Sequence, residues 1–153
     1  MADLSAGTTV YGEDTPPTVG DEEAGQFTFN ATTYGMDVDS GTGNDCGVAF
    51  IAPTTGRVRI DYAAQLDNDT ALQGTSLAPV VRQGGTVGTG VSVLAASDVY
   101  RLLNIGTDAG AWGSFCLVTG LVAGDTYNVR LEHKVSGGIG TILNRRVAVN
   151  PCT

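Results

Sequence analysis

The clearest pattern in this sequence is an alternation of apolar and polar residues with a period of two. In residues 57–66 every even-numbered position is apolar, and the odd-numbered positions are mostly polar. In residues 127–135 the odd-numbered positions are apolar apart from His133. A period of two is typical of a β-strand with one buried face. The sequence therefore predicts strands over both segments, the second entered through a turn at 122–126.

Shorter apolar or alternating segments predict further strands. They cover residues 26–34, 46–52, 75–83, 91–96, 99–105, 112–119 and 139–149. Turn-forming residues recur about every 8–12 positions, which is the spacing of a sandwich or barrel. Pro79 has no backbone N–H, so the 75–83 strand is expected at a sheet edge or bulge. In the last strand, the odd-numbered residues from Ile139 to Val149 are expected to share one face.

The N-terminal residues show no such pattern and predict an extended arm over 1–25, followed by a folded β-sandwich domain over 26–153. The Pro16-Pro17 pair excludes a helix there, and few apolar residues are available to anchor the segment. Alone it should not fold. We expect it to gain order from a partner, and the candidate contacts are Leu4, Val10, Tyr11, Glu13 and Asp14.

Composition and charge narrow the classes of protein. Glycine supplies 22 of 153 residues, roughly double the usual share. Residues 1–45 hold nine of the 16 acidic residues and none of the eight Lys and Arg, so the other 108 residues carry a net charge of +1. The overall charge of −8 argues against a nucleic-acid partner. No apolar run approaches the ~18 residues of a membrane span, and residues 1–20 lack the features of a signal peptide. The acidic segment either keeps the protein soluble or docks on an arginine-bearing partner.

Three cysteines, Cys46, Cys116 and Cys152, are widely spaced and have no CxxC pair. This spacing makes a zinc site unlikely to form and fits a protein that folds in a reducing cytoplasm. Cys46 and Cys116 lie in apolar runs and are expected to be buried. Cys152, near the end of the chain, is expected to be accessible.

Candidate chemistry is sparse. His133 lies on the apolar parity of its strand, without a carboxylate or nucleophile assigned to it, so a buried or interface histidine is favoured over a catalytic base. Asp37, Asp39 and Asp45 resemble half a calcium loop, but the closing glutamate is missing, which favours a loop of Asx turns. The glycine-rich segment 84–90 lacks the lysine of a phosphate-binding loop and is expected to join two strands. We therefore expect no metal, no cofactor and no enzymatic activity.

Three stretches carry a resemblance to known proteins. They are the opening MADLSAGTTV (1–10), NDCGVAFIAPTTGRVRI (44–60) and VTGLVAGDTYNVRLEHKVSGG (118–138). Together they look like small virion proteins of tailed phages that infect actinobacteria. The apolar run, Ala-Pro-Thr-Thr-Gly turn and alternating strand also resemble the trimeric jelly rolls of the tumour-necrosis-factor type. That resemblance implies a jelly-roll-like antiparallel β-sandwich and a homotrimer, with Phe50, Tyr62 and His133 as candidates for the trimer interface.

Two functions follow from the resemblance. In the first, the protein decorates the outer capsid surface as a trimer, contacts the major capsid protein and stabilises the shell. In the second, it is a minor tail or tail-fibre protein that binds the host surface, for example a glycan. Either function places the protein in the virion, assembled in the host cytoplasm, with no membrane or nucleic-acid partner.

Overall fold

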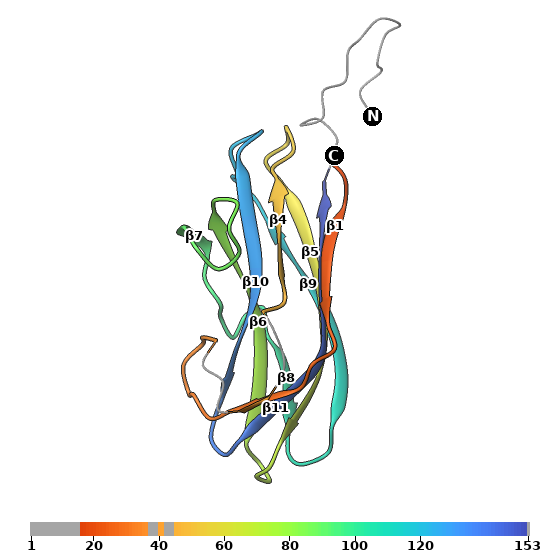
Figure 1. The fold of residues 1–153 in the computed structure, drawn as a ribbon, viewed down its shortest axis with the longest axis vertical. Helices are drawn as coiled ribbons and strands as arrows, with labels where there is room; N and C mark the ends of the chain where they lie inside the picture. Colours follow the sequence, from red (N-terminus) through yellow and green to blue (C-terminus); the bar gives the residue numbers. More distant parts are fainter. Residues whose placement is uncertain (1–15, 37–39, 42–44, 153) are drawn as a thin grey trace, which may run out of the picture.

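The protein is all-β. The computed structural model describes residues 16–36, 40–41 and 45–152, and these form strands and turns without a helix (Figure 1). None of these residues therefore builds a helix that is long and apolar enough to cross a membrane. The strands are β1 (Val19–Glu23), β2 (Phe27–Phe29), β3 (Ser40–Gly41), β4 (Gly47–Ile51), β5 (Val58–Asn68), β6 (Gly74–Gln83), β7 (Val91–Leu94), β8 (Leu102–Ile105), β9 (Gly110–Val118), β10 (Thr126–Val135) and β11 (Gly140–Pro151).

Two antiparallel sheets pack face to face as a sandwich. The first sheet has the order β3-β2-β11-β5-β9, with β1 also paired to β11. The second has the order β4-β10-β6-β7, with β8 also paired to β6. Strands from the two ends of the chain pair with each other, and successive pairs lie closer to the middle of the sequence. Thus β11 pairs with β1 and β2, β10 with β4, and β9 with β5, while β6 pairs with β7 and β8. A rolled hairpin of this kind is a jelly roll, so the predicted fold class is confirmed.

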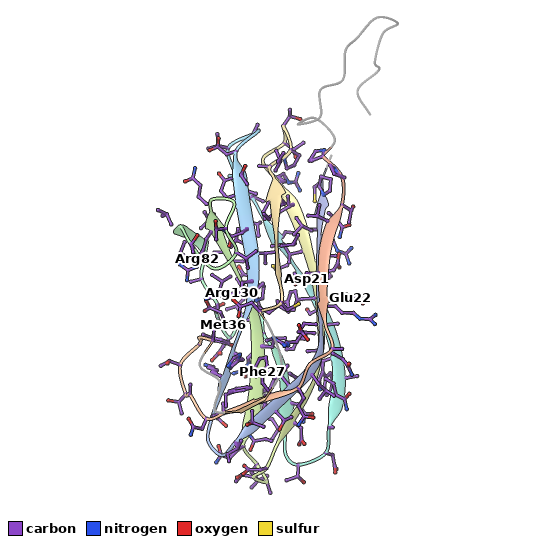
Figure 2. The ribbon with its side chains drawn as sticks, in the orientation of Figure 1. Asp21, Glu22, Phe27, Met36, Arg82 and Arg130 are labelled. Carbon is purple, nitrogen blue, oxygen red and sulfur yellow. The ribbon has the colours of Figure 1, made fainter. Side chains whose placement is uncertain are left out.

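The core lies between the sheets and follows the alternation read from the sequence. In β5 the even-numbered residues from Val58 to Leu66 are buried. In β10 the odd-numbered residues from Tyr127 to Val135 are buried. Figure 2 shows Phe27 among the side chains that fill the space between the sheets. Both strands are long, and each packs its apolar side chains on one face while the other face is polar, which is why their period was readable.

The last strand departs from the expected parity. A register shift between Leu143 and Arg146 marks a β-bulge, and Asn144 adopts a positive φ of 52° there. Before the bulge the even-numbered Ile142 is buried, whereas Ile139 is 43% exposed. After it the odd-numbered residues point inwards. An inserted residue reverses the alternation of the strand that contains it, so the prediction of one shared odd face is wrong for the first half of β11.

Strand β6 is an interior strand, so the edge position expected from Pro79 is wrong. It pairs with β10 on one side and with both β8 and β7 on the other. However, the pairing of β6 with β8 extends only to Leu77, and its pairing with β7 starts only at Val81. Leu131, opposite Pro79, donates its N–H to Cys46 on the far side of β10. The proline nitrogen therefore faces the interval between β7 and β8, where no ladder hydrogen bond is required of it.

The expected boundary between arm and domain is also corrected. Strand β1 lies inside residues 1–25, yet all five of its residues pair with β11. Asp21 of β1 accepts a hydrogen bond from the Gly47 N–H of β4 at 2.9 Å, which ties the two sheets together. The folded part therefore begins before residue 26, because β1 completes the first sheet.

The strand expected over 26–34 is shorter than its sequence pattern. Only Phe27–Phe29 pairs within the first sheet. The chain then crosses to the second sheet, where Gly35 exchanges backbone hydrogen bonds with His133 and Ala31 accepts one from Val135. Residues 31–35 thereby run beside β10 beyond the end of β4.

Cysteine burial agrees with the sequence. All three cysteines are free, Cys46 and Cys116 are buried, and Cys152 is half-buried. Burial, reinforced by the nearby Asp21 carboxylate, raises the pKa of Cys46 to about 12. Burial likewise raises the pKa of Cys116 to about 11.

A thiol titration at pH 8 should therefore find one reactive cysteine in the native protein, Cys152, and three after unfolding. Both buried thiols have a pKa above the ~8.5 of an unfolded cysteine. Their contribution to stability is thus complete below about pH 8.5 and is lost as the pH rises towards their folded values. Three rapidly reacting thiols in the native protein at pH 8 would contradict the buried positions.

Candidate functional site

The three predicted trimer-interface residues lie inside their own chain. Phe50 is 5%, Tyr62 3% and His133 0% exposed. The His133 ring packs against Phe27 and Phe29, with ring centroids 4.9 and 3.9 Å away, and the Tyr62 hydroxyl donates to the Tyr100 carbonyl oxygen. The burial of His133 confirms its expected structural place. A contact of these residues with a second subunit stays a prediction, and the surface available to a partner lies elsewhere.

The other predicted site residues are placed as follows. Leu4, Val10, Tyr11, Glu13 and Asp14 lie outside the described residues, as do Asp37 and Asp39. Asp45 is described, and its carboxylate forms an ion pair with Arg130 at 3.6 Å. Within the described residues, no group of three or more His, Cys, Asp and Glu side chains is arranged to hold a metal ion.

The outward face of the first sheet carries a shallow hollow of about 820 Å³, termed here the outer hollow. It extends over β1, β11, β5 and β9. Strand register places Gly20, Ala148, Asp61 and Phe115 in one cross-strand row, and Glu22, Arg146, Ala63 and Gly113 in the next. Each row contains two residues with little or no side chain, so the centre of the sheet face is low. A protruding side chain of a partner would fit there.

Both arginines that line the outer hollow form ion pairs. The Arg59 guanidinium bonds Asp61 at 2.6 and 2.9 Å and lies 4.3 Å from the centre of the Phe115 ring. Arg146 pairs with Glu22 at 3.4 Å. Both pairs are exposed, and such pairs add little to the stability of the single chain. Both arginines of this face therefore have a carboxylate partner, and apolar and small residues lie between the two ion pairs.

Strand β9 forms the edge of the first sheet, directly beside the outer hollow. Trp112, Phe115 and Leu117 are each about half exposed, and residues 110–118 contain no charged residue and no proline. Edge strands usually carry lysine, proline or a bulge that prevents association. Here the described residues supply none of these along nine residues of strand. Among the described residues, the edge of β9 and the outer hollow together offer a continuous surface to a partner, with the exposed Phe115 and Leu117 beside the hollow.

Sequence reasoning identified the β9 strand but missed this surface. The absence of charge over 110–118 was a usable signal. The position of β9 at a sheet edge could not be predicted from the sequence, because the order of strands in a sheet depends on residues that are distant along the chain.

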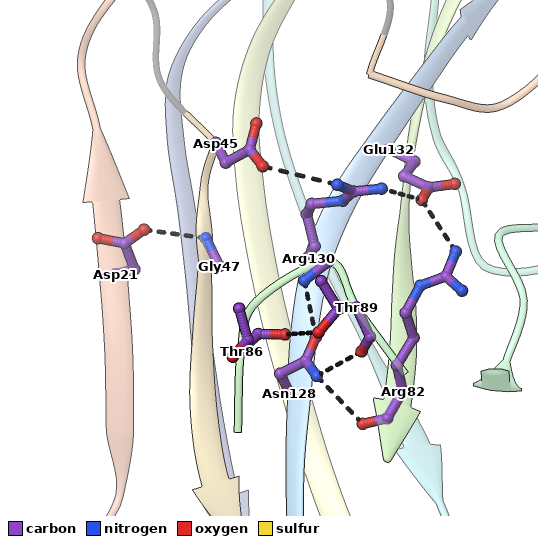
Figure 3. Close-up of polar contacts among 10 residues, drawn as sticks. Asp21, Asp45, Gly47, Arg82, Thr86, Thr89, Asn128, Arg130 and Glu132 are labelled. Atoms are coloured by element: carbon purple, nitrogen blue, oxygen red, sulfur yellow. Dashed lines mark hydrogen bonds and ion pairs between the residues drawn. The ribbon is translucent and has the colours of Figure 1, made fainter. Parts of the chain in front are cut away.

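A second polar site holds the glycine-rich loop over the outward face of the second sheet (Figure 3). The loop joins β6 to β7, as predicted. The Oδ1 atom of Asn128 accepts from the Gly88 N–H at 2.9 Å. Its Nδ2 atom donates to the carbonyl oxygens of Arg82, Gly84 and Thr89, at 3.5, 2.9 and 3.1 Å. This fully buried amide thus bonds backbone groups of the loop and of the end of β6, so the loop is held in place by the protein's own residues.

Ion pairs extend this site along β10 (Figure 3). Glu132 pairs with Arg130 at 2.7 Å and with Arg82 at 3.7 Å, and Arg130 also reaches Asp45. The Glu132 side chain is only 9% exposed. Figure 2 places Arg82 and Arg130 on the opposite side of the sandwich from Glu22. These contacts stabilise the loop and leave the outer hollow as the candidate interaction site.

Comparison with known proteins identifies the fold and no family. No protein-family model and no curated protein sequence matches the chain. Among solved structures it is similar to Eiger TNF from S. frugiperda, at 8% identity and a TM-score of 0.50, over 90% of this chain and 94% of that chain. It also matches a structure of infectious bursal disease virus, Gx strain, at 11% identity and a TM-score of 0.49, over 88% of this chain and 32% of that one. A xylan-binding module, CBM15, matches at 13% identity and a TM-score of 0.39, over 90% of this chain and 99% of that one.

At such low identity, these similarities show only the fold of the chain. The chain is a jelly-roll β-sandwich with a fold like that of Eiger TNF.

Proposed function

We propose that the protein is a virion structural protein of a tailed phage, a capsid decoration protein that binds the outer head surface as a homotrimer and stabilises the shell. It acts by binding and has no catalytic role. The proposal is supported by the sequence resemblance over residues 1–10, 44–60 and 118–138. It is also supported by a jelly-roll fold of the kind found in Eiger TNF.

The observation that carries the proposal is the uncharged edge of β9 beside the outer hollow. Water is a poor environment for Phe115 and Leu117, each 52% exposed. Burial of apolar surface stabilises an assembly by about 25 cal/mol per Å². A second and a third copy of the chain would provide that burial without placing an unpaired charge in the contact, because the arginines of this face already have carboxylate partners.

A decoration protein would stabilise the capsid shell by mass action. A protein that binds the assembled shell and not its separate subunits shifts the equilibrium towards the shell. A trimer presents three identical contacts, so weak individual contacts combine into strong attachment. The acidic N-terminal residues, with Leu4, Val10, Tyr11, Glu13 and Asp14 as predicted contacts, would meet the major capsid protein.

Copy number in purified virions tests this function. We expect hundreds of copies per particle, located on the head by electron microscopy of particles labelled with an antibody against the chain. Gel densitometry against the major capsid protein supplies the count. A handful of copies confined to the tail would contradict decoration and support the alternative, a minor tail protein that binds the host surface.

A further inference from the structure

The outward face of the second sheet contains a smaller pocket, separate from the outer hollow. Its volume is about 360 Å³, near the lower end of the ~300–1,000 Å³ typical of small-molecule sites. Strands β6, β8 and β10 form its floor. The turn before β8 contributes Asp98 and Arg101, and β10 contributes Lys134.

One carboxylate oxygen organises the polar end of this pocket. The Oδ1 atom of Asp98 receives the Lys134 ammonium at 2.7 Å, the Tyr34 hydroxyl at 3.0 Å and the Arg101 guanidinium at 3.2 Å. The Lys134 ammonium also lies 4.7 Å from the centre of the Tyr34 ring. The hydrogen bond from Lys134 holds the pKa of Asp98 below its usual value. Burial, together with the bond to Asp98, raises the pKa of Tyr34, so the phenol stays protonated and donates.

The two cations retain donors that Asp98 does not use. A guanidinium has five N–H groups and an ammonium three, whereas the contacts found for Arg101 and Lys134 among the described residues go to one oxygen. Their side chains are 31% and 21% exposed, so they are held in place and accessible. With two cations and one anion, this end of the pocket has a net charge of +1 on a chain whose net charge is −8.

The rest of the pocket is amphipathic. Leu103 and Ile105 of β8 provide an aliphatic wall, and the polar residues Thr32, Ser76 and Ser136 line other parts. A sugar ring has the matching properties, with C–H groups on its faces and hydroxyl groups around its rim. A carboxylate attached to such a ring would meet the spare donors of Arg101 and Lys134.

We propose that this pocket binds the carboxylate of a sugar acid, with Arg101 and Lys134 as the anion-binding residues and Leu103 and Ile105 as the surface for the ring. The proposal does not depend on decoration of a capsid, because the pocket lies on the opposite sheet from the outer hollow.

The test is a titration of the full-length protein with glucuronate, in which two-dimensional amide NMR spectra are recorded at each concentration. We expect saturable shifts of pocket residues with millimolar affinity, and at least tenfold weaker binding for glucose and for acetate. Replacing both cations (Arg101→Gln with Lys134→Gln) should weaken glucuronate binding at least tenfold, since a charged hydrogen bond contributes roughly this factor or more. The control Arg57→Gln removes an exposed cation just before β5, outside both the pocket and the outer hollow, and should leave the affinity unchanged.

Several results would overturn the proposal. One is the lack of any shift in the pocket at 100 mM glucuronate, a concentration chosen about tenfold or more above the expected dissociation constant. Equal binding of glucose would remove the role of the carboxylate, and equal binding of acetate would remove the role of the ring. The three wild-type titrations need no variant, and the same spectra report whether the double variant is folded.

Discussion

Replacing Leu117 with lysine should convert the proposed trimer into a folded monomer. Leu117 lies on the exposed edge strand β9, opposite Arg59 of β5. In the single chain its side chain is 52% exposed, so a lysine can extend into water and stability should change by no more than about 1 kcal/mol. In an assembly that covers this edge, the lysine would be buried beside the Arg59 charge. Lysine is the residue that natural edge strands use to prevent association.

The expected effect on assembly is large. Loss of a buried leucine costs about 1.5–3 kcal/mol per contact, and desolvation of an unpaired ammonium adds several more. Since 1.4 kcal/mol corresponds to a factor of ten, each contact should weaken by at least about 100-fold. Light scattering coupled to size-exclusion chromatography measures the mass, and thermal denaturation measures the fold.

A matched control separates this edge from any general effect of charge. Val91→Lys introduces the same side chain on β7, at an exposed position in the other sheet, and should leave the proposed trimer intact. A trimeric Leu117→Lys protein would show that β9 is not part of the contact. If the wild-type chain is a monomer at high concentration, the proposed trimer is wrong.

Replacing Asn128 with alanine should destabilise the fold by about 3 kcal/mol, because it removes a fully buried amide that is hydrogen-bonded through both its oxygen and its nitrogen. The substitution removes hydrogen bonds to four backbone groups around the glycine-rich loop. For a chain of this size the melting temperature should fall by roughly 6–12 °C. Calorimetry or circular dichroism provides the measurement.

Two further variants make this prediction specific. Asn128→Asp keeps the oxygen that accepts from Gly88 but places a carboxylate against three carbonyl oxygens, so it should be at least as destabilising at neutral pH. Thr86→Ala alters an exposed residue of the same loop and should change stability by less than about 0.5 kcal/mol. If Asn128→Ala melts within about 2 °C of the wild type, the loop is held by other contacts.

The alternation of apolar and polar residues was sufficient to predict the core-facing side chains where a strand is long and has one apolar face. The period of two in β5 and β10 determined which side chains fill the core, because neighbouring residues of a strand point to opposite faces. The interior position of His133 followed from the same parity, and the burial of Cys46 and Cys116 followed from the apolar runs that contain them. The jelly-roll class came from the number and spacing of such strands together with the resemblance of three short stretches.

Local pattern failed where a distant segment decides the environment. The bulge at Asn144 reverses the parity of β11 because that strand must pair with β5 on both sides of an extra residue. It also brings Arg145 into the interior, 1% exposed, with its guanidinium 4.1 Å from the centre of the Phe27 ring. Burial lowers the pKa of this arginine. No feature of residues 139–149 alone indicates that a cation belongs there.

The sequence by itself determined an all-β chain, the faces of its longest strands, and the concentration of negative charge in the first 45 residues. Only the tertiary structure decided that β1 belongs to the first sheet, that β9 is an exposed edge, and that Asp98, Arg101 and Lys134 meet in one pocket. The physical reason is the range of the interactions. Alternation is dictated by the geometry of a single strand, whereas edges, hollows and pockets arise from pairings between segments that are far apart along the chain.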